Sequence, residues 1–281
     1  MIHLGDNQYR LCLLDTNAVS EMAKHDEVMR HFLTWSLSTP PFFIPCYSLF
    51  TVLEVRRSDE GYRKFIERFG PLPSMIVKSH EQLLEDETHS YPDPSAIDPT
   101  LLGFAGELGA DGTRLAKVLP HAFGTKSILD QERGWNEARD EIVEGIGSLV
   151  SNFPPQQGDA YALSEVRLFL QIAGLDQLRL RALGFAESVL VENGAIVDID
   201  AFPSLKATLY TVFHKFYADR TRKPSRSDAF DIMISAVTPY VEAIITENHQ
   251  AEVLRKTKNL DTFLQDLEVF TLRDFREAAP A

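Results

Sequence analysis

Acidic side chains follow short apolar segments at several places in this chain, in a pattern suited to holding a metal ion. The first is Asp15, which follows the apolar residues 11–14 and precedes Thr16 and Asn17. A carboxylate at the carboxyl end of a buried strand lies where open α/β sheets bind their ligands. A turn or helix cap is the alternative for Asp15, because Asp and Asn also form hydrogen bonds with the nearby backbone.

Four further acids occur in similar settings: Glu54, Asp228, Asp231 and Glu247. Asp228 and Asp231 are three residues apart, so they share one face of a helix. Carboxylates gathered at one edge of a sheet repel one another unless a cation lies between them. Hard oxygen ligands of this kind suit Mg²⁺ or Mn²⁺, and such ions can activate water for cleavage of a phosphodiester.

Each of these acids also has an ordinary structural interpretation. Glu54 could be solvated or pair with Arg56 or Arg57. Asp228 stands at an expected helix start, where a capping role is equally open. Asp231 has apolar neighbours, and an unpartnered carboxylate buried there is costly, which favours a functional role.

Short apolar strands alternate with helices at both ends of the chain, which predicts an α/β protein with one parallel sheet assembled from both termini. Strands are expected at residues 11–14, 42–46, 75–78, 243–246 and 267–271. Helices are expected at residues 17–24, 27–37, 48–57, 58–69, 202–220, 228–240 and 249–256.

The middle of the chain lacks this alternation. We expect residues 1–80 and 201–281 to form one domain and residues 81–200 to form an acidic, mainly helical insertion. Residues 91–99 contain three prolines and predict a loop. Helices are expected within the insertion at residues 126–150, 160–172 and 176–192.

The net charge and the distribution of apolar residues argue against some functions for this protein. The net charge of −13 argues against a broad nucleic-acid-binding surface, and residues 71–200 alone carry 21 acidic and 9 basic side chains. No apolar run reaches the ~18 residues of a membrane helix, and the first ten residues lack a signal-peptide core. Cys12 and Cys46 are expected to be small buried hydrophobes. We therefore expect a soluble, cytoplasmic protein without membrane contact.

One basic segment, residues 214–226, ends beside Asp228. It could guide a phosphate backbone toward the acids, or it could be a solvated helix end whose cations complement the helix dipole. The candidate RNA-binding residues of this segment are Arg220, Arg222, Lys223 and Arg226, and Lys215 belongs to the same stretch.

Four sequence blocks, in this order, resemble the motifs of PIN-domain nucleases, a family that includes the toxin ribonucleases of bacterial toxin–antitoxin pairs. The blocks are LLDTNAVSEM, YSLFTVLEVRR, SDAFDIMISAV and AIITENH. The resemblance makes Asp15 the first acid, Glu54 the helix glutamate and Asp231 the third acid, with Asp228 as an additional catalytic candidate. Glu247 stands where the family usually has aspartate, after Thr246.

The resemblance implies a three-layer α/β/α fold with a four- or five-stranded parallel sheet and hydrolysis of RNA by a divalent-metal-dependent mechanism. Asp15, Glu54, Asp231 and Glu247 would hold Mg²⁺ or Mn²⁺. The residues implied to position the substrate or the first aspartate are Thr16, Asn17 and Thr246.

Two departures from the family pattern leave other functions open: the longer side chain of Glu247, and the insertion at residues 81–200. One alternative is a catalytically weak PIN-like protein that acts as a protein- or RNA-binding module. Another is a structure-selective deoxyribonuclease, because the same metal pocket serves both nucleic acids. An inhibitory protein partner and a homo-oligomer are also open.

Overall fold

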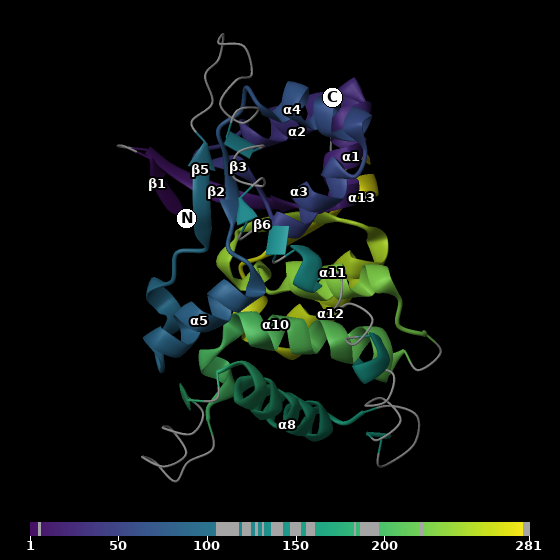
Figure 1. Cartoon of the computed structure of the whole chain (residues 1–281). Helices are drawn as coiled ribbons and strands as arrows, with labels where there is room; N and C mark the ends of the chain where they lie inside the picture. Colours follow the sequence, from purple (N-terminus) through teal and green to yellow (C-terminus); the bar gives the residue numbers. More distant parts are fainter. Residues whose placement is uncertain are drawn as a thin grey trace.

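In a computed structural model of the chain, the described strands form one sheet, and they come from both ends of the sequence (Figure 1). The structure describes residues 1–4, 7–104, 161–182, 184–185, 197–219 and 222–277, together with short segments between residues 118 and 155. The seven strands of the sheet are β1 (Ile2–Leu4), β2 (Asn7–Leu14), β3 (Phe42–Tyr47), β4 (Ser74–Val77), β5 (Thr100–Phe104), β6 (Ala243–Thr246) and β7 (Glu268–Thr271).

The strand order β5-β4-β3-β2-β6-β7 places β2 beside β6, so that the first long strand of the chain pairs with one from its last quarter. Strands β4, β3, β2, β6 and β7 are parallel, as the sequence pattern predicted. The sheet nevertheless has more strands than expected, because β1 pairs with β2 and β5 pairs with β4, both antiparallel. Strand β5 comes from the predicted insertion, so the sheet extends beyond the boundary expected at residue 80.

Helices lie on both faces of the sheet (Figure 1). On one face lie α1 (Thr16–Lys24), α2 (Asp26–Ser36), α3 (Leu49–Arg56), α4 (Asp59–Phe69) and α13 (Leu272–Glu277). The other group comprises α5 (His80–Ser90), α10 (Pro203–Val212), α11 (Arg226–Ser235) and α12 (Asn248–Leu260), with α8 (Leu163–Arg181) outside α10. Short 3-10 turns are η1 (Pro94–Ala96), η2 (Ile199–Ala201), η4 (Thr238–Tyr240) and η5 (Thr262–Leu264).

The helix predictions for the second half of the chain need three corrections. The helix expected at residues 228–240 is α11, which ends at Ser235, followed by the separate 3-10 turn η4. The expected helix at residues 202–220 is α10 followed by a π-helical segment, η3 (Phe213–Ala218). The two helices expected at residues 160–172 and 176–192 are instead one helix, α8, over its described length. Most of the helix expected at residues 126–150 lies outside the described residues.

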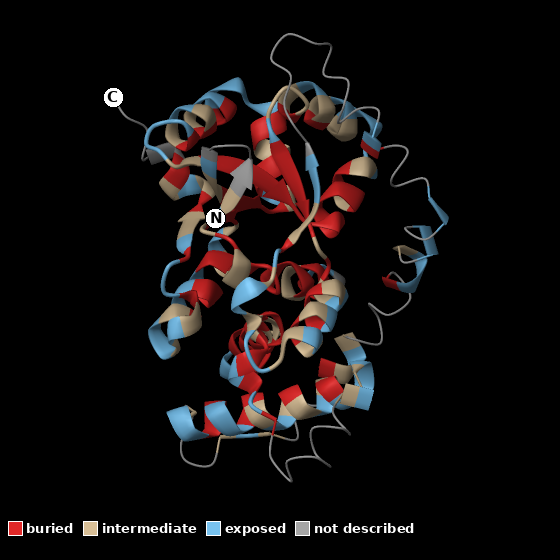
Figure 2. Cartoon of the chain, turned by 90° about the vertical axis from the view of Figure 1, so that its left-hand side faces the viewer, coloured by how far each residue is buried: buried red, intermediate tan, exposed pale blue. Residues whose placement is uncertain are grey.

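Buried apolar side chains form two cores. The larger surrounds the strands, where the residues from Leu11 to Leu14 are fully buried (Figure 2). The smaller lies between α8, α10 and η3 and includes Phe169, Phe213 and Tyr217. Cys12 and Cys46 are free, buried thiols in the strands, as expected. Within the described part of the chain, no helix has the length and apolar character that a membrane crossing requires.

A buried carboxylate, Glu87 on α5, joins three elements of the second helical group. It accepts hydrogen bonds from the Ser204 backbone N–H (2.6 Å), from the Ser204 hydroxyl (2.7 Å) and from the Tyr240 hydroxyl (2.6 Å). Burial raises the pKa of Glu87 to about 7, although these hydrogen bonds act to lower it. Glu87 therefore links α5 to α10 and η4 through a group that titrates near neutral pH.

We expect Glu87→Gln to flatten the pH dependence of stability. Between the ordinary pKa of 4.5 and about 7, the folded chain binds more protons at Glu87 than the unfolded chain does, so stability falls as the pH rises through this window. The glutamine variant cannot titrate there, and the fall should be smaller by up to about 3 kcal/mol. Urea unfolding at pH 5 and pH 7 measures the difference. The exposed Glu85→Gln on the same helix should keep the wild-type slope, and an equal slope for both variants would contradict the assignment.

Candidate functional site

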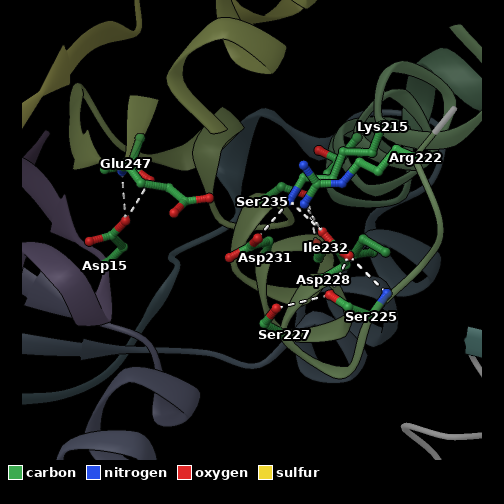
Figure 3. Close-up of polar contacts among 12 residues, drawn as sticks. Asp15, Lys215, Arg222, Ser225, Ser227, Asp228, Asp231, Ile232, Ser235 and Glu247 are labelled. Carbon is green, nitrogen blue, oxygen red and sulfur yellow. Dashed lines mark hydrogen bonds and ion pairs between the residues drawn. The ribbon is translucent and has the colours of Figure 1, made fainter. Parts of the chain in front are cut away.

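The carboxylate of Asp15 joins the carboxyl ends of the neighbouring strands β2 and β6 (Figure 3). Asp15 follows β2 and caps α1, because its Oδ1 accepts a hydrogen bond from the Ala18 N–H at 2.6 Å. Its Oδ2 accepts from the Thr246 hydroxyl at 2.5 Å and from the Glu247 N–H at 3.0 Å. The parallel pairing of β2 with β6 brings these residues together. The structure thus places three of the predicted site residues in direct contact.

The environment of Asp15 disfavours its charged form. Asp15 is only 7% exposed, and burial raises the pKa of its carboxyl group to about 6. The hydrogen bonds from Thr246, Ala18 and Glu247 act in the opposite direction, and the negative charge of Asp231 raises the pKa further. Asp231 is therefore close enough to act electrostatically on Asp15, although it comes from the other side of the site.

Glu54 reaches the site through Thr16. Helix α3 starts directly after β3, and the Ser48 hydroxyl caps it by accepting a hydrogen bond from the Thr51 N–H at 3.0 Å. The hydroxyl of Thr16 donates a hydrogen bond to Oε2 of Glu54. Thr16 thus holds the glutamate beside Asp15.

Asp228 and Asp231 project from α11 toward a buried lysine, Lys215 of η3 (Figure 3). The Lys215 ammonium lies 2.5 Å from Oδ2 of Asp231 and 3.2 Å from Oδ1 of Asp228, and its side chain is fully buried. Nη2 of Arg222 lies 2.6 Å from the same Asp228 oxygen. These two cations and two acids form an ion-pair network on one side of the site.

Asp228 also caps its own helix. Its Oδ2 accepts hydrogen bonds from the backbone N–H (2.9 Å) and the hydroxyl (2.6 Å) of Ser225, so the capping role considered for Asp228 is confirmed. Burial acts to raise the pKa of Asp228, but the bonds from Ser225 and the charges of Lys215 and Arg222 outweigh it and hold the pKa below its usual range.

Glu247 extends between the two sides of the site, from the Asp15 side toward Asp231 (Figure 3). Partial burial raises its pKa, and the charge of Asp231 adds to that rise, whereas Lys215 and Arg222 act to lower it. The charges of Asp231, Lys215 and Arg222 act on Glu247, and Asp231 also acts on Asp15, so four of the candidate acids and the two cations share one electrostatic environment. With every group ionised, these four carboxylates, the neighbouring Glu54 and the two cations carry a formal charge of −3.

The structure describes only part of the basic segment. Arg222 is partly buried and pairs with Asp228. The next residue, Lys223, is exposed. Arg220 and the side chain of Arg226 lie outside the described residues. Asn17 is exposed on α1, where it could still meet a substrate.

Lys215 is a charged residue of the site whose position the sequence did not predict. Its place in a basic segment suggested contact with a phosphate backbone, but the structure buries it completely against α11. The available signal was its flanking sequence, because Phe213, Phe216 and Tyr217 mark a helix segment with a large buried surface. An ion-pairing partner is then required, since burying an unpaired ammonium is costly.

Among the described residues, no three His, Cys, Asp or Glu side chains are grouped as a metal site in their present orientations. Protein donors engage the acids instead: Thr246 engages Asp15, Thr16 engages Glu54, and Lys215 engages Asp231. Comparisons of the chain with protein-family models, with curated proteins and with solved structures give no match. What the site can do must therefore follow from its own side chains.

Proposed function

We propose that this chain is a divalent-metal-dependent ribonuclease with a PIN-like, three-layer α/β/α fold. The observation that carries this proposal is the seam between β2 and β6, where the Asp15 carboxylate meets Thr246 and Glu247. Glu54 lies one hydrogen bond away, through Thr16. Open α/β sheets bind ligands at such carboxyl edges, and acids concentrated there attract cations.

The donor set fits Mg²⁺ or Mn²⁺, because carboxylate oxygens are the ligands these hard ions prefer. The raised pKa values of Asp15 and Glu247 reflect burial together with unbalanced negative charge, which a bound cation would relieve. Asp15, Glu54 and Glu247 would hold the ion, together with the oxygen of Asp231 that Lys215 does not contact. When bound, it supplies an activated water and stabilises the leaving oxygen of a phosphodiester.

The protein itself contributes orientation. Thr246 and two backbone N–H groups fix both oxygens of Asp15, and Thr16 fixes Glu54. Ligands held by such neighbouring hydrogen bonds need little reorganisation when an ion and a substrate arrive. Exposed Lys223 follows Arg222 along the chain and is available to attract an RNA phosphate.

One observation favours the second candidate, a catalytically weak PIN-like protein that binds RNA or a protein partner. Lys215 already neutralises part of the charge of Asp228 and Asp231, which reduces the demand for an external cation. Such a protein would retain the fold and an RNA-binding surface but would cut slowly.

A cleavage assay separates the candidates. We expect the purified chain to cut labelled single-stranded RNA in the presence of Mn²⁺, and we expect an excess of chelator to stop the reaction, because the acids cannot activate water without the ion. Matched single-stranded DNA and flap-shaped DNA serve as comparison substrates. RNA that is bound but left intact would support the binding module, and cleavage of flap DNA alone would support the deoxyribonuclease.

A further inference from the structure

A change from α-helix to π-helix places Lys215 in the site. Helix α10 passes into the π-helical segment η3, which has more residues per turn and therefore redirects the side chains that follow. Phe213 and Tyr217 of η3 pack on Phe169 of α8, with ring centroids 5.5 Å and 4.6 Å away. Lys215, between them, instead reaches the acids of α11. The second core thus anchors the segment that delivers the ammonium.

The hydrogen bonds of Asp228 leave it little capacity to bind an ion. Its two oxygens accept from Lys215, from Arg222 and from both the N–H and the hydroxyl of Ser225. A carboxylate offers about four acceptor positions, so these four donors satisfy it. Hydrogen-bond donors of the protein therefore fill the acceptor positions of Asp228.

The two sides of the site differ in their cations. Lys215 and Arg222 lie on the Asp228–Asp231 side (Figure 3). Among the described residues, no salt bridge joins Asp15 or Glu247 to a cationic side chain. Metal pairs in nucleases are held about 4 Å apart by acids on both sides, so an ammonium on one side takes oxygens that a second ion would need.

We propose that Lys215 is a resident counter-ion that replaces one divalent cation, so that the site binds a single ion, on the Asp15–Glu247 side. This inference rests on the proposed metal site and specifies how many ions it takes. An ammonium and a divalent ion compete for the same carboxylate oxygens and repel each other at short distance. Loss of Lys215 would leave Asp231 without its cation and would free one acceptor position on each of Asp228 and Asp231, while Arg222 stays paired with Asp228.

The test is the number of Mn²⁺ ions bound by the full chain, measured by calorimetric titration and by electron paramagnetic resonance of free Mn²⁺. We expect about one ion per chain for the wild type and about two for Lys215→Met, in line with two-metal sites. The melting temperature of Lys215→Met should also rise more steeply with Mn²⁺ than that of the wild type. Lys215→Arg keeps the charge and should bind one ion.

The outcomes separate this inference from the proposed function. Two ions on the wild type, or equal ion numbers and equal Mn²⁺ dependence of melting for the wild type and Lys215→Met, would overturn the counter-ion role. No ion on the wild type but one on Lys215→Met would support the counter-ion role of Lys215, but it would overturn the single-ion site and refute the proposed metal-dependent activity.

A charge-balanced double variant covers the case in which Lys215→Met fails to fold without Mn²⁺. Combining Lys215→Met with Asp231→Asn removes one charge of each sign, so we expect this chain to fold without Mn²⁺ and to bind no second ion. Failure of the double variant to fold would show that Lys215 acts through packing, and the counter-ion role would be rejected.

Discussion

Replacing Asp15 with asparagine should reduce kcat/KM for Mn²⁺-dependent RNA cleavage by more than about 100-fold, while the fold stays intact. Loss of a group that only supports a metal ligand costs about 10- to 100-fold, so loss of a direct ligand should cost more. Asparagine preserves the shape of the side chain and is a good helix cap, which protects α1. Because burial raises the pKa of Asp15 to about 6, the wild-type chain loses stability as the pH rises through this value, and the neutral variant does not.

Steady-state cleavage kinetics and thermal melting at pH 7.5 check both parts of this expectation. Asp266→Asn, the same change at an exposed turn position, is the matched control and should retain wild-type kinetics. Cleavage at the wild-type rate by Asp15→Asn would remove Asp15 from the mechanism. Loss of both activity and fold would instead assign Asp15 a structural role at the strand seam.

Replacing Asp228 with asparagine should destabilise the chain by about 3–5 kcal/mol, the cost typical of breaking a buried ion pair. The side chain of Asp228 is only 2% exposed, and its loss of charge leaves the fully buried Lys215 with Asp231 as its remaining acid. Arg222 loses its acid as well. Urea unfolding followed by linear extrapolation gives the free energy of unfolding of each variant.

The matched control for this variant is Asp274→Asn. Asp274 pairs with Arg255 at 2.6 Å, the same distance that separates Arg222 from Asp228, but the Asp274 pair is nearly half exposed. Exposed ion pairs contribute about 1 kcal/mol or less, so the control should lose little. If the two variants are destabilised equally, the buried network around Lys215 does not stabilise the fold as described.

Local patterns in the sequence predicted the parallel strands and the strand-end acids. Strand β6 has the bounds expected for residues 243–246, because four buried apolar residues between polar ones are a sufficient signal. Strand β2 starts earlier than expected, since its first half has polar residues that pair with β1 and with Phe42 and Phe43 of β3. The contact between Asp15 and Thr246 follows from parallel pairing, which the alternation of strands and helices predicts.

Long-range partners explain what the sequence did not predict. Strand β5 is a five-residue apolar segment containing Gly103, and only its pairing with β4 distinguishes it from a loop. Lys215 follows a change from α-helix to π-helix that alternation of apolar residues does not reveal. Its two acidic partners lie 13 and 16 residues further along the chain, so charge alone suggested a surface cation.

The seam between β2 and β6 also determines when the site can exist. The hydrogen bond from Thr246 to Asp15 joins residues 231 positions apart, so it cannot form until β6 has left the ribosome. A nascent chain that ends before residue 243 contains Asp15 and Glu54 but lacks the strand that completes their pocket. Synthesis from the amino terminus therefore keeps a growing chain without a complete acid cluster until β6 has emerged and paired with β2.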